Sequence, residues 1–286
     1  MRKKWFLFIT LLGFIVIVSG CSDDEESKKD GPKGITAKSQ KNEKVDAGPL
    51  LQSAAEKLKS SQGSAFSLIG SQQLSLQGEE NPATNQIDMT GEEKGQPATI
   101  THLNGKINQQ KPMEFYLTNG YIYEKIGADP WTKRAAAVMQ RKPADSLILA
   151  NKIIEAIKGL ANVKGAEAEK QGSIYILKIP KKVLDQASPS LSQEIQTYQQ
   201  TALDSEISKK NPGKKTEGLT IDDIGAKLIL NANTKEVTKI TTNLKTTFQL
   251  DQQTHVIEED MEKSLTGPLS NDIQIPSNAS SAQEIK

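Results

Sequence analysis

The chain has 286 residues, of which 36 are lysine or arginine, 35 are aspartate or glutamate, and 36% are hydrophobic. This length allows one large domain or two smaller ones, because single domains commonly span roughly 100–200 residues. A charge balance so close to neutral argues against the basic face that nucleic-acid binding needs, and equally against a polybasic patch for membrane surfaces.

Residues 1–20 have the layout of a lipoprotein or secretory signal peptide. Three basic residues at positions 2–4 precede an apolar run from Trp5 to Val18, and two small residues follow it. A transmembrane helix is the alternative, but crossing a bilayer takes about 20 apolar residues, and this run is shorter. We therefore expect an exported protein.

The residues Val18, Ser19, Gly20 and Cys21 resemble a bacterial lipobox, whose usual pattern is leucine, a small residue, glycine or alanine, and then cysteine. The resemblance implies that Cys21 receives a diacylglyceryl group and becomes the mature N-terminus. Cys21 is the only cysteine, so an internal disulfide is excluded, and the alternative is an incidental thiol. Because two acyl chains anchor a protein firmly, we expect a lipid-anchored protein on the extracellular side of the cell membrane.

Residues 21–47 are predicted to be the lipidated cysteine and a disordered stalk. Between Ser22 and Ala47 only Ile35 and Val45 are large and apolar, which is too little buried surface to offset the entropy of ordering. The acidic run over residues 23–26 is interpreted as solvated spacer rather than as a metal site, because contiguous carboxylates lack a turn that wraps around an ion.

The next segment is expected to form a short helix followed by a strand. Five apolar residues fall on one helical face, namely Leu50, Leu51, Ala54, Ala55 and Leu58. From Phe66 to Leu76 the pattern changes to alternation, which is typical of a half-buried strand.

Two Asn-Gly dipeptides, at Asn104–Gly105 and Asn119–Gly120, predict tight turns between antiparallel strands. At the second of them, a two-residue turn pairs residues 113–118 with residues 121–126. That register places apolar side chains on one face and a tyrosine pair on the other, which makes this hairpin the best supported in the chain.

The remaining elements are two helices and several further strands. Taken in order, the patterns predict a helix from about Pro143, a strand over 174–179, a helix over about 189–209, strands over 224–230 and 237–250, and a last strand from about Val256. Trp131 is interpreted as a core anchor rather than a ligand-stacking platform.

Because helices do not separate the strands one by one, the fold class is α+β rather than a doubly wound parallel sheet. We expect a curved antiparallel sheet, a half-barrel, covered by a few helices. Residues 48–267 are predicted to form this single domain, and residues 268–286 a flexible C-terminal tail.

The inventory of catalytic and metal-binding residues is thin. His102 and His255 are the only histidines and are interpreted as ordinary sheet residues. Adjacent strand residues point to opposite faces, so the acidic run over residues 258–260 does not present a prearranged acid/base pair, and it is interpreted as solvated surface. No nucleophile elbow, phosphate-binding loop or zinc-binding helix motif occurs, so we expect no enzyme activity, no cofactor and no metal.

The phrase between Glu114 and Lys133 reads "EFYLTNGYIYEKIGADPWTK". This phrase and the order of elements resemble uncharacterised lipoproteins of Gram-positive bacteria related to the LolA/LppX superfamily. The resemblance implies a half-barrel sheet closed by helices and a carrier of lipid, of a lipoprotein or of another hydrophobic ligand. It transfers no individual binding residue.

An incompletely filled space between sheet and helices would accept a hydrophobic ligand. Its candidate lining residues are Phe66, Leu68, Phe115, Leu117, Ile122, Leu147, Ile154, Ile157 and Phe248. The alternative is a solidly packed core in an envelope lipoprotein that contacts another protein or regulates it. A solute receptor of a transporter fits the anchor but not the expected fold.

Overall fold

The computed structural model describes residues 42–284 apart from 77–81, 96–99, 119, 137–142, 161–162, 211–212 and 270. The predicted signal peptide, the lipobox and Cys21 lie outside the described residues. The described residues belong to one compact unit, Gln40–Lys286. None of its described helices is long and apolar enough to cross a membrane.

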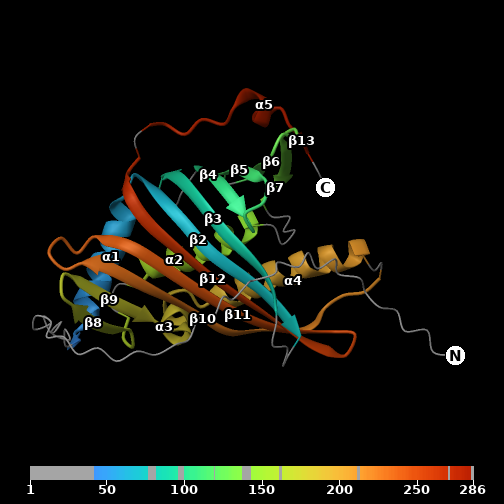
Figure 1. The fold of residues 1–286 in the computed structure, drawn as a ribbon. Coiled ribbons are helices and arrows are strands. Elements are labelled where there is room, and N and C mark those ends of the chain that lie inside the picture. The colour runs from blue at the N-terminus through green and yellow to red at the C-terminus, as the bar shows by residue number, and fades with distance from the viewer. Residues whose placement is uncertain are drawn as a thin grey trace, which may run out of the picture. The chain divides into compact units, whose positions relative to one another are not determined.

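Thirteen strands form one sheet in the described part of the chain (Figure 1). Their order across the sheet is β1-β8-β9-β10-β11-β12-β2-β3-β4-β5-β6-β7-β13, so the sheet is open, with β1 and β13 at its edges. Neighbouring strands are antiparallel except β7 and β13, which are parallel. The strands are β1 (Glu43–Val45), β2 (Gly63–Leu76), β3 (Ala83–Lys94), β4 (Ile100–Ile107), β5 (Pro112–Thr118), β6 (Tyr121–Ile126), β7 (Thr132–Ala135), β8 (Glu167–Gln171), β9 (Ile174–Ile179), β10 (Glu217–Asn231), β11 (Val237–Leu250), β12 (Gln253–Pro268) and β13 (Gln283–Glu284).

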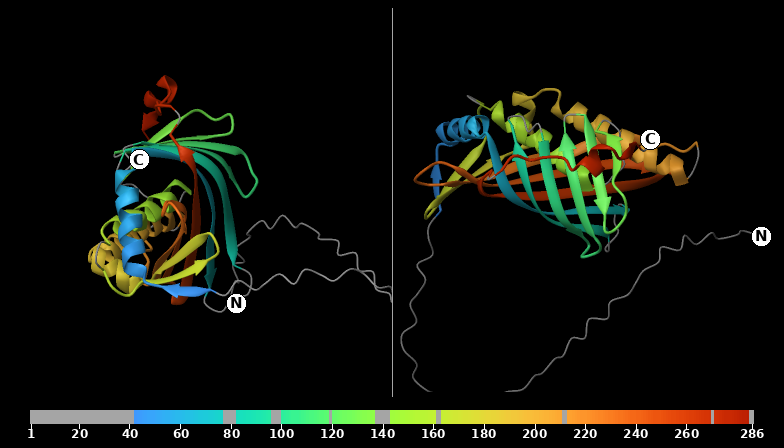
Figure 2. Two further views of the ribbon diagram at one scale, coloured as in Figure 1. Left: turned by 90° about the vertical axis from the view of Figure 1, so that its left-hand side faces the viewer. Right: turned by 90° about the horizontal axis from the view of Figure 1, so that it is seen from above.

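The sheet curves strongly, and four helices lie on its concave side (Figure 2, left). These are α1 (Ala47–Ser60), α2 (Pro143–Lys158), α3 (Lys181–Ala187) and α4 (Leu191–Lys210). The short α5 (Ser277–Ser280) lies on the opposite, convex side. The predicted α+β class with a curved, open and mostly antiparallel sheet is therefore confirmed.

Helix α1 forms where the apolar pattern predicts it, and all five residues of the predicted stripe are buried. Its start is fixed by Asp46, whose side chain accepts a hydrogen bond from the backbone N–H of Gly48 at 3.0 Å. The buried stripe faces α2 and the sheet, so the sequence pattern sets which side of this helix meets the core.

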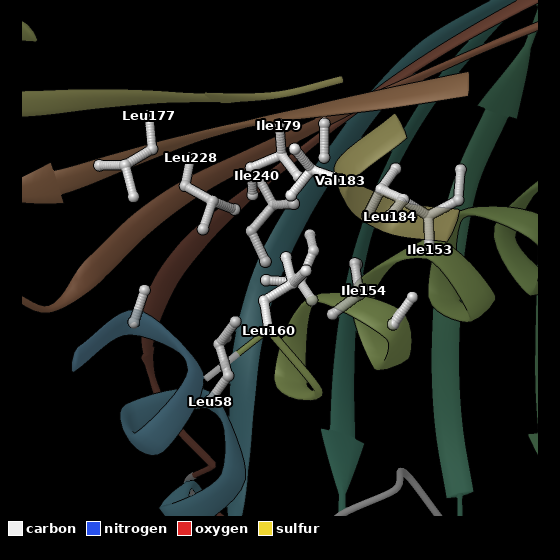
Figure 3. Packing of buried hydrophobic residues seen from close by; sticks show 14 of the residues in the cluster. Leu58, Ile153, Ile154, Leu160, Leu177, Ile179, Val183, Leu184, Leu228 and Ile240 are labelled. Carbon is white, nitrogen blue, oxygen red and sulfur yellow. The ribbon is translucent and has the colours of Figure 1, made fainter. Parts of the chain in front are cut away.

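Two apolar clusters fill most of the concave side. The larger, hereafter the helix cluster, joins α1–α4 to strands β8–β11 and includes Leu58, Ile154 and Ile240 (Figure 3). The second, the sheet cluster, joins α2 to β12 and β2–β6 and includes Phe66 and Phe115. Ile148 on α2 packs against both clusters, so the helices and the sheet meet through apolar contacts along this side.

The start of α2 is tied to the far end of the sheet by a buried ion pair. Arg134 on β7 donates from Nη2 to Oδ1 of Asp145 at 2.7 Å, and both side chains are at most 3% exposed. Asp145 lies in the first turn of α2, where a carboxylate also interacts favourably with the helix dipole.

The β5–β6 hairpin has the predicted register. Met113 pairs with Ile126, Tyr116 with Tyr123, and Leu117 with Ile122. Phe115, Leu117 and Ile122 are buried on the concave side, so the predicted apolar face is confirmed.

The turn predicted at Asn104–Gly105 is wrong, because both residues lie inside β4 and pair with β3 and β5. Gly105 meets a close backbone approach instead of forming a turn. A Cβ at this position would lie 2.2 Å from the carbonyl oxygen of Asp88 and 2.6 Å from Cα of Met89. Glycine is therefore needed here because no side chain would fit. The Asn-Gly dipeptide alone does not show whether its glycine serves a turn or a close backbone contact.

Parts of the predicted stalk and tail form secondary structure at the two edges of the sheet. Glu43–Val45, assigned to the disordered stalk, form β1 and pair with β8. Within the segment expected to be a flexible tail, α5 buries Ala279 against Tyr116 and Trp131, and β13 pairs with β7. These short segments complete the sheet edges through long-range backbone pairing, which local composition does not reveal.

Candidate functional site

An open groove of about 1120 Å³ lies between the helices and the concave face of the sheet. Its walls come from the C-terminal end of α1, from α2, from the junction of α3 and α4, and from strands β2–β5, β11 and β12. Figure 3 shows three of its apolar lining residues, Leu58, Ile154 and Ile240, brought together from α1, α2 and β11. The groove is slightly larger than the roughly 300–1,000 Å³ that is typical of small-molecule sites.

Charged side chains line this groove among the apolar ones. They are four lysines and four glutamates, so that the formal charge of the lining is 4 − 4 = 0: Lys57, Lys152, Lys158, Lys263, Glu93, Glu155, Glu194 and Glu236. A lining that mixes apolar walls with charged groups is suited to a ligand with both an apolar and a polar part.

The most buried ion pair of the groove joins Lys263 on β12 to Glu93 on β3. The Nζ atom lies 2.5 Å from Oε2 of the carboxylate, and the side chains are 6% and 12% exposed. The other carboxylate oxygen, Oε1, accepts a hydrogen bond from the hydroxyl of Ser64 at 3.1 Å. These three residues are hereafter the floor site.

The floor site spans three neighbouring strands. Strand β2 lies between β12 and β3, so Lys263 has to cross β2 to reach Glu93. Its Nζ lies 4.2 Å above the ring centroid of Phe66, a cation–π contact. The ring in turn lies against Gly91, where a Cβ would be only 2.7 Å from the ring. The missing side chain at Gly91 therefore lets the ring lie flat beneath the lysine.

Burial of the two charges of the floor site costs desolvation free energy. Desolvation lowers the pKa of Lys263 below its usual value, while the charge and the hydrogen bond of Glu93 oppose that shift. Removing two charges from water often exceeds their mutual attraction, so a buried pair adds little stability by itself. A buried, charge-paired lysine with a perturbed pKa in a groove marks a candidate functional site.

Two further ion pairs of the groove lie along α2. Lys158 Nζ is 2.5 Å from Oε1 of Glu155, and Lys152 Nζ is 2.8 Å from Oε2 of Glu194 on α4. The glutamates of these pairs are 43% and 48% exposed, so the pairs are wetter than the floor site. The groove therefore contains three lysine–glutamate pairs that differ in their exposure to water.

Two of the nine predicted lining residues, Leu117 and Ile154, do line the groove. The others are packed into the core: Phe66, Leu68, Phe115, Ile122 and Leu147 in the sheet cluster, Ile157 in the helix cluster, and Phe248 in a third cluster beneath α4. The groove thus lies at one end of the predicted layer between sheet and helices, and contact of these residues with a ligand stays a prediction.

The floor site was not predicted from the sequence, although β12 carries a usable signal. Every second side chain of β12 points to the concave side of the sheet. Lys263 belongs to this row, together with the buried Ile257 and Met261. The same row corrects the interpretation of residues 258–260 as surface. Glu259 is only 5% exposed and accepts a hydrogen bond from Nε2 of Gln199 at 2.8 Å.

Both histidines lie in strands, as predicted. His102 on β4 stacks on Tyr116 with ring centroids 4.4 Å apart and contacts Oε1 of Glu114 at 3.0 Å. Burial and the charge of Glu114 raise the pKa of Tyr116 to about 12. His255 on β12 stacks on Phe248. Within the described ranges, no three histidine, cysteine, aspartate or glutamate side chains come together as metal ligands.

No family model and no curated protein matches this chain. Among solved structures, one of lipovitellin, whose subject is lipid–protein interactions, is similar to this chain with 10% identity and a TM-score of 0.31. The similarity covers 77% of this chain and 26% of the lipovitellin chain. A DUF1329 family protein from Desulfovibrio piger is similar over 79% and 94%, with 13% identity and a TM-score of 0.31. The ywiB protein from Bacillus subtilis is similar over 72% and 94%, with 6% identity and a TM-score of 0.23. The match covers about a quarter of the lipovitellin chain.

Proposed function

We propose that this protein is a membrane-anchored extracytoplasmic lipoprotein whose groove binds a lipid or another amphipathic ligand without chemical turnover. The observation that carries the proposal is the groove of about 1120 Å³, whose lining combines apolar side chains with polar ones and with the buried ion pair of the floor site. Apolar walls supply affinity for an acyl chain at about 0.8 kcal/mol per buried methylene. The charged groups would orient the polar end of the ligand.

The groove supports binding rather than catalysis because six of its eight charged groups form ion pairs with one another. Lys263 and Glu93 form a pair, and the second carboxylate oxygen of Glu93 accepts from Ser64. A general base needs a carboxylate or amine that faces the reacting group of a substrate. In the floor site both groups are already committed to neighbouring side chains.

One observation favours a second function, contact with another envelope protein. Most of the predicted cavity residues are packed solidly, so the exterior of the domain would then carry the activity. A ligand-binding measurement separates the two functions, since a protein that acts only through its exterior has no saturable apolar site.

The chain from Ser22 onward, produced without lipid, is expected to bind the uncharged dye Nile red saturably at one site. All the apolar clusters and the groove lie within the compact unit Gln40–Lys286, so this form retains the whole fold. Dye fluorescence is measured against protein concentration, with urea-unfolded protein as the control. Fluorescence that rises linearly without saturation would contradict a groove site.

The anchor is tested at Cys21, the proposed site of lipid attachment. In the native host, the wild-type protein is expected to incorporate a radiolabelled fatty acid, and Cys21→Ser is expected to lose the label, because the thiol that would carry the diacylglyceryl group is gone. Metabolic labelling followed by immunoprecipitation measures this, and Ser19→Ala, which keeps a small residue, is the matched control. Equal labelling of Cys21→Ser would contradict lipid attachment at Cys21.

A further inference from the structure

Six of the eight charged residues that line the groove form three ion pairs, each of one lysine with one glutamate. Lys263 has Glu93 at 2.5 Å, Lys158 has Glu155 at 2.5 Å, and Lys152 has Glu194 at 2.8 Å. At each of these three pairs, a ligand meets a positive and a negative group next to each other.

A headgroup with a single charge fits this arrangement poorly. To contact Lys263 closely, an anion would have to displace Glu93, whose side chain is only 12% exposed and would keep its charge in a largely dry site. A cation that displaced Lys263 from Glu93 would leave the lysine, only 6% exposed, in the same position. Uncompensated buried charge is strongly unfavourable, so each exchange loses more than it gains.

A headgroup that carries both charges avoids this loss. Its anionic oxygens accept hydrogen bonds from a lysine while its cationic end lies beside the paired glutamate, so both protein charges keep a partner. The neighbouring Ser64 hydroxyl offers a further polar contact at the floor, where it already donates to Glu93.

We propose that the groove selects amphiphiles whose headgroup is zwitterionic, with no net charge, over amphiphiles with an anionic or a cationic headgroup. The proposal rests on the proposed ligand-binding function and names the chemical class of its ligand. Selection comes from the paired lysines and glutamates, and the apolar walls contribute equally to all three classes.

Three amphiphiles with the same dodecyl chain length test this selection in the Nile red assay on the chain from Ser22 onward. Dodecylphosphocholine is zwitterionic, dodecanoate is anionic, and dodecyltrimethylammonium is cationic. All are used below the concentrations at which they form micelles. We expect dodecylphosphocholine to displace the dye with an affinity at least about tenfold higher than either charged amphiphile, the factor that corresponds to 1.4 kcal/mol.

Two variants each remove one of the two charges of the floor site. Glu93→Gln leaves Lys263 as the charged partner. It is expected to raise the affinity for dodecanoate, relative to the affinity for dodecylphosphocholine, at least about fivefold. Lys263→Gln leaves Glu93 as the charged partner. It is expected to raise the affinity for dodecyltrimethylammonium, relative to dodecylphosphocholine, by a similar factor. Lys239→Gln, in an exposed pair with Glu262 outside the groove lining, is the control and should change neither ratio.

The outcomes separate this inference from the function on which it rests. Wild-type protein that binds dodecanoate or dodecyltrimethylammonium as tightly as dodecylphosphocholine overturns the charge selection and leaves groove binding intact. Nile red binding that none of the three amphiphiles displaces overturns the selection as well. No saturable Nile red binding at all overturns the proposed function. The wild-type comparison is decisive even if a floor-site variant does not fold.

Discussion

Replacing Lys263 with methionine is expected to lower the free energy of unfolding by about 3 kcal/mol. The substitution removes one partner of a buried ion pair and leaves the carboxylate of Glu93, 12% exposed, without its charged partner on β12. Equilibrium urea unfolding followed by circular dichroism measures the loss.

The matched control is Lys239→Met. Lys239 on β11 contacts Glu262 on β12 at 2.6 Å, but the two side chains are 33% and 36% exposed. Exposed pairs typically contribute about 0–1 kcal/mol, so this variant should lose far less stability. The double variant Glu93→Met/Lys263→Met should recover most of the loss, because it leaves no unpaired charge. Similar losses for the two single lysine variants would show that burial does not set the energetics of the floor site.

Replacing Leu265 with tryptophan is expected to weaken Nile red binding at least about tenfold. Leu265 lines the groove on β12, two residues beyond Lys263, and is only partly buried against the sheet cluster. The larger indole would occupy groove volume that the dye and an acyl chain need. The measurement is the same dye titration used for the wild-type protein.

The control for the blocked groove is Ile69→Trp. Ile69 on β2 is 54% exposed and does not line the groove, so tryptophan there adds comparable bulk elsewhere on the sheet. Its dye affinity should equal that of the wild type. Unfolding midpoints of both variants verify that the fold is intact. If Leu265→Trp is folded and binds the dye normally, the bound ligand does not occupy this groove.

Local patterns were enough to predict the elements whose partners are close in sequence. Helix α1 and the β5–β6 hairpin are both correct, because helical periodicity and a two-residue turn act within a few residues. The edge strands β1 and β13 were missed. Each consists of two or three residues, and its only support is a pairing with a strand far along the chain.

The floor site was missed for the same physical reason. Its three residues, at positions 64, 93 and 263, meet only because β12 pairs with β2 and β2 with β3. Strand order decides which residues become neighbours, and no local pattern encodes that order. What the sequence does indicate is that a lysine stands in an apolar row of β12, which marks Lys263 as unusual once the phase of that strand is known.

The most direct test of the account is the identification of small molecules that copurify with the wild-type protein from its native host. The folded protein is isolated, washed and extracted with organic solvent, and the extract is analysed by mass spectrometry beside an equal amount of Leu265→Trp. We predict an approximately stoichiometric acyl-chain amphiphile with the wild type and its loss from the variant. Noncovalent lipid that is absent from both, or equal in both, would contradict a ligand-binding groove.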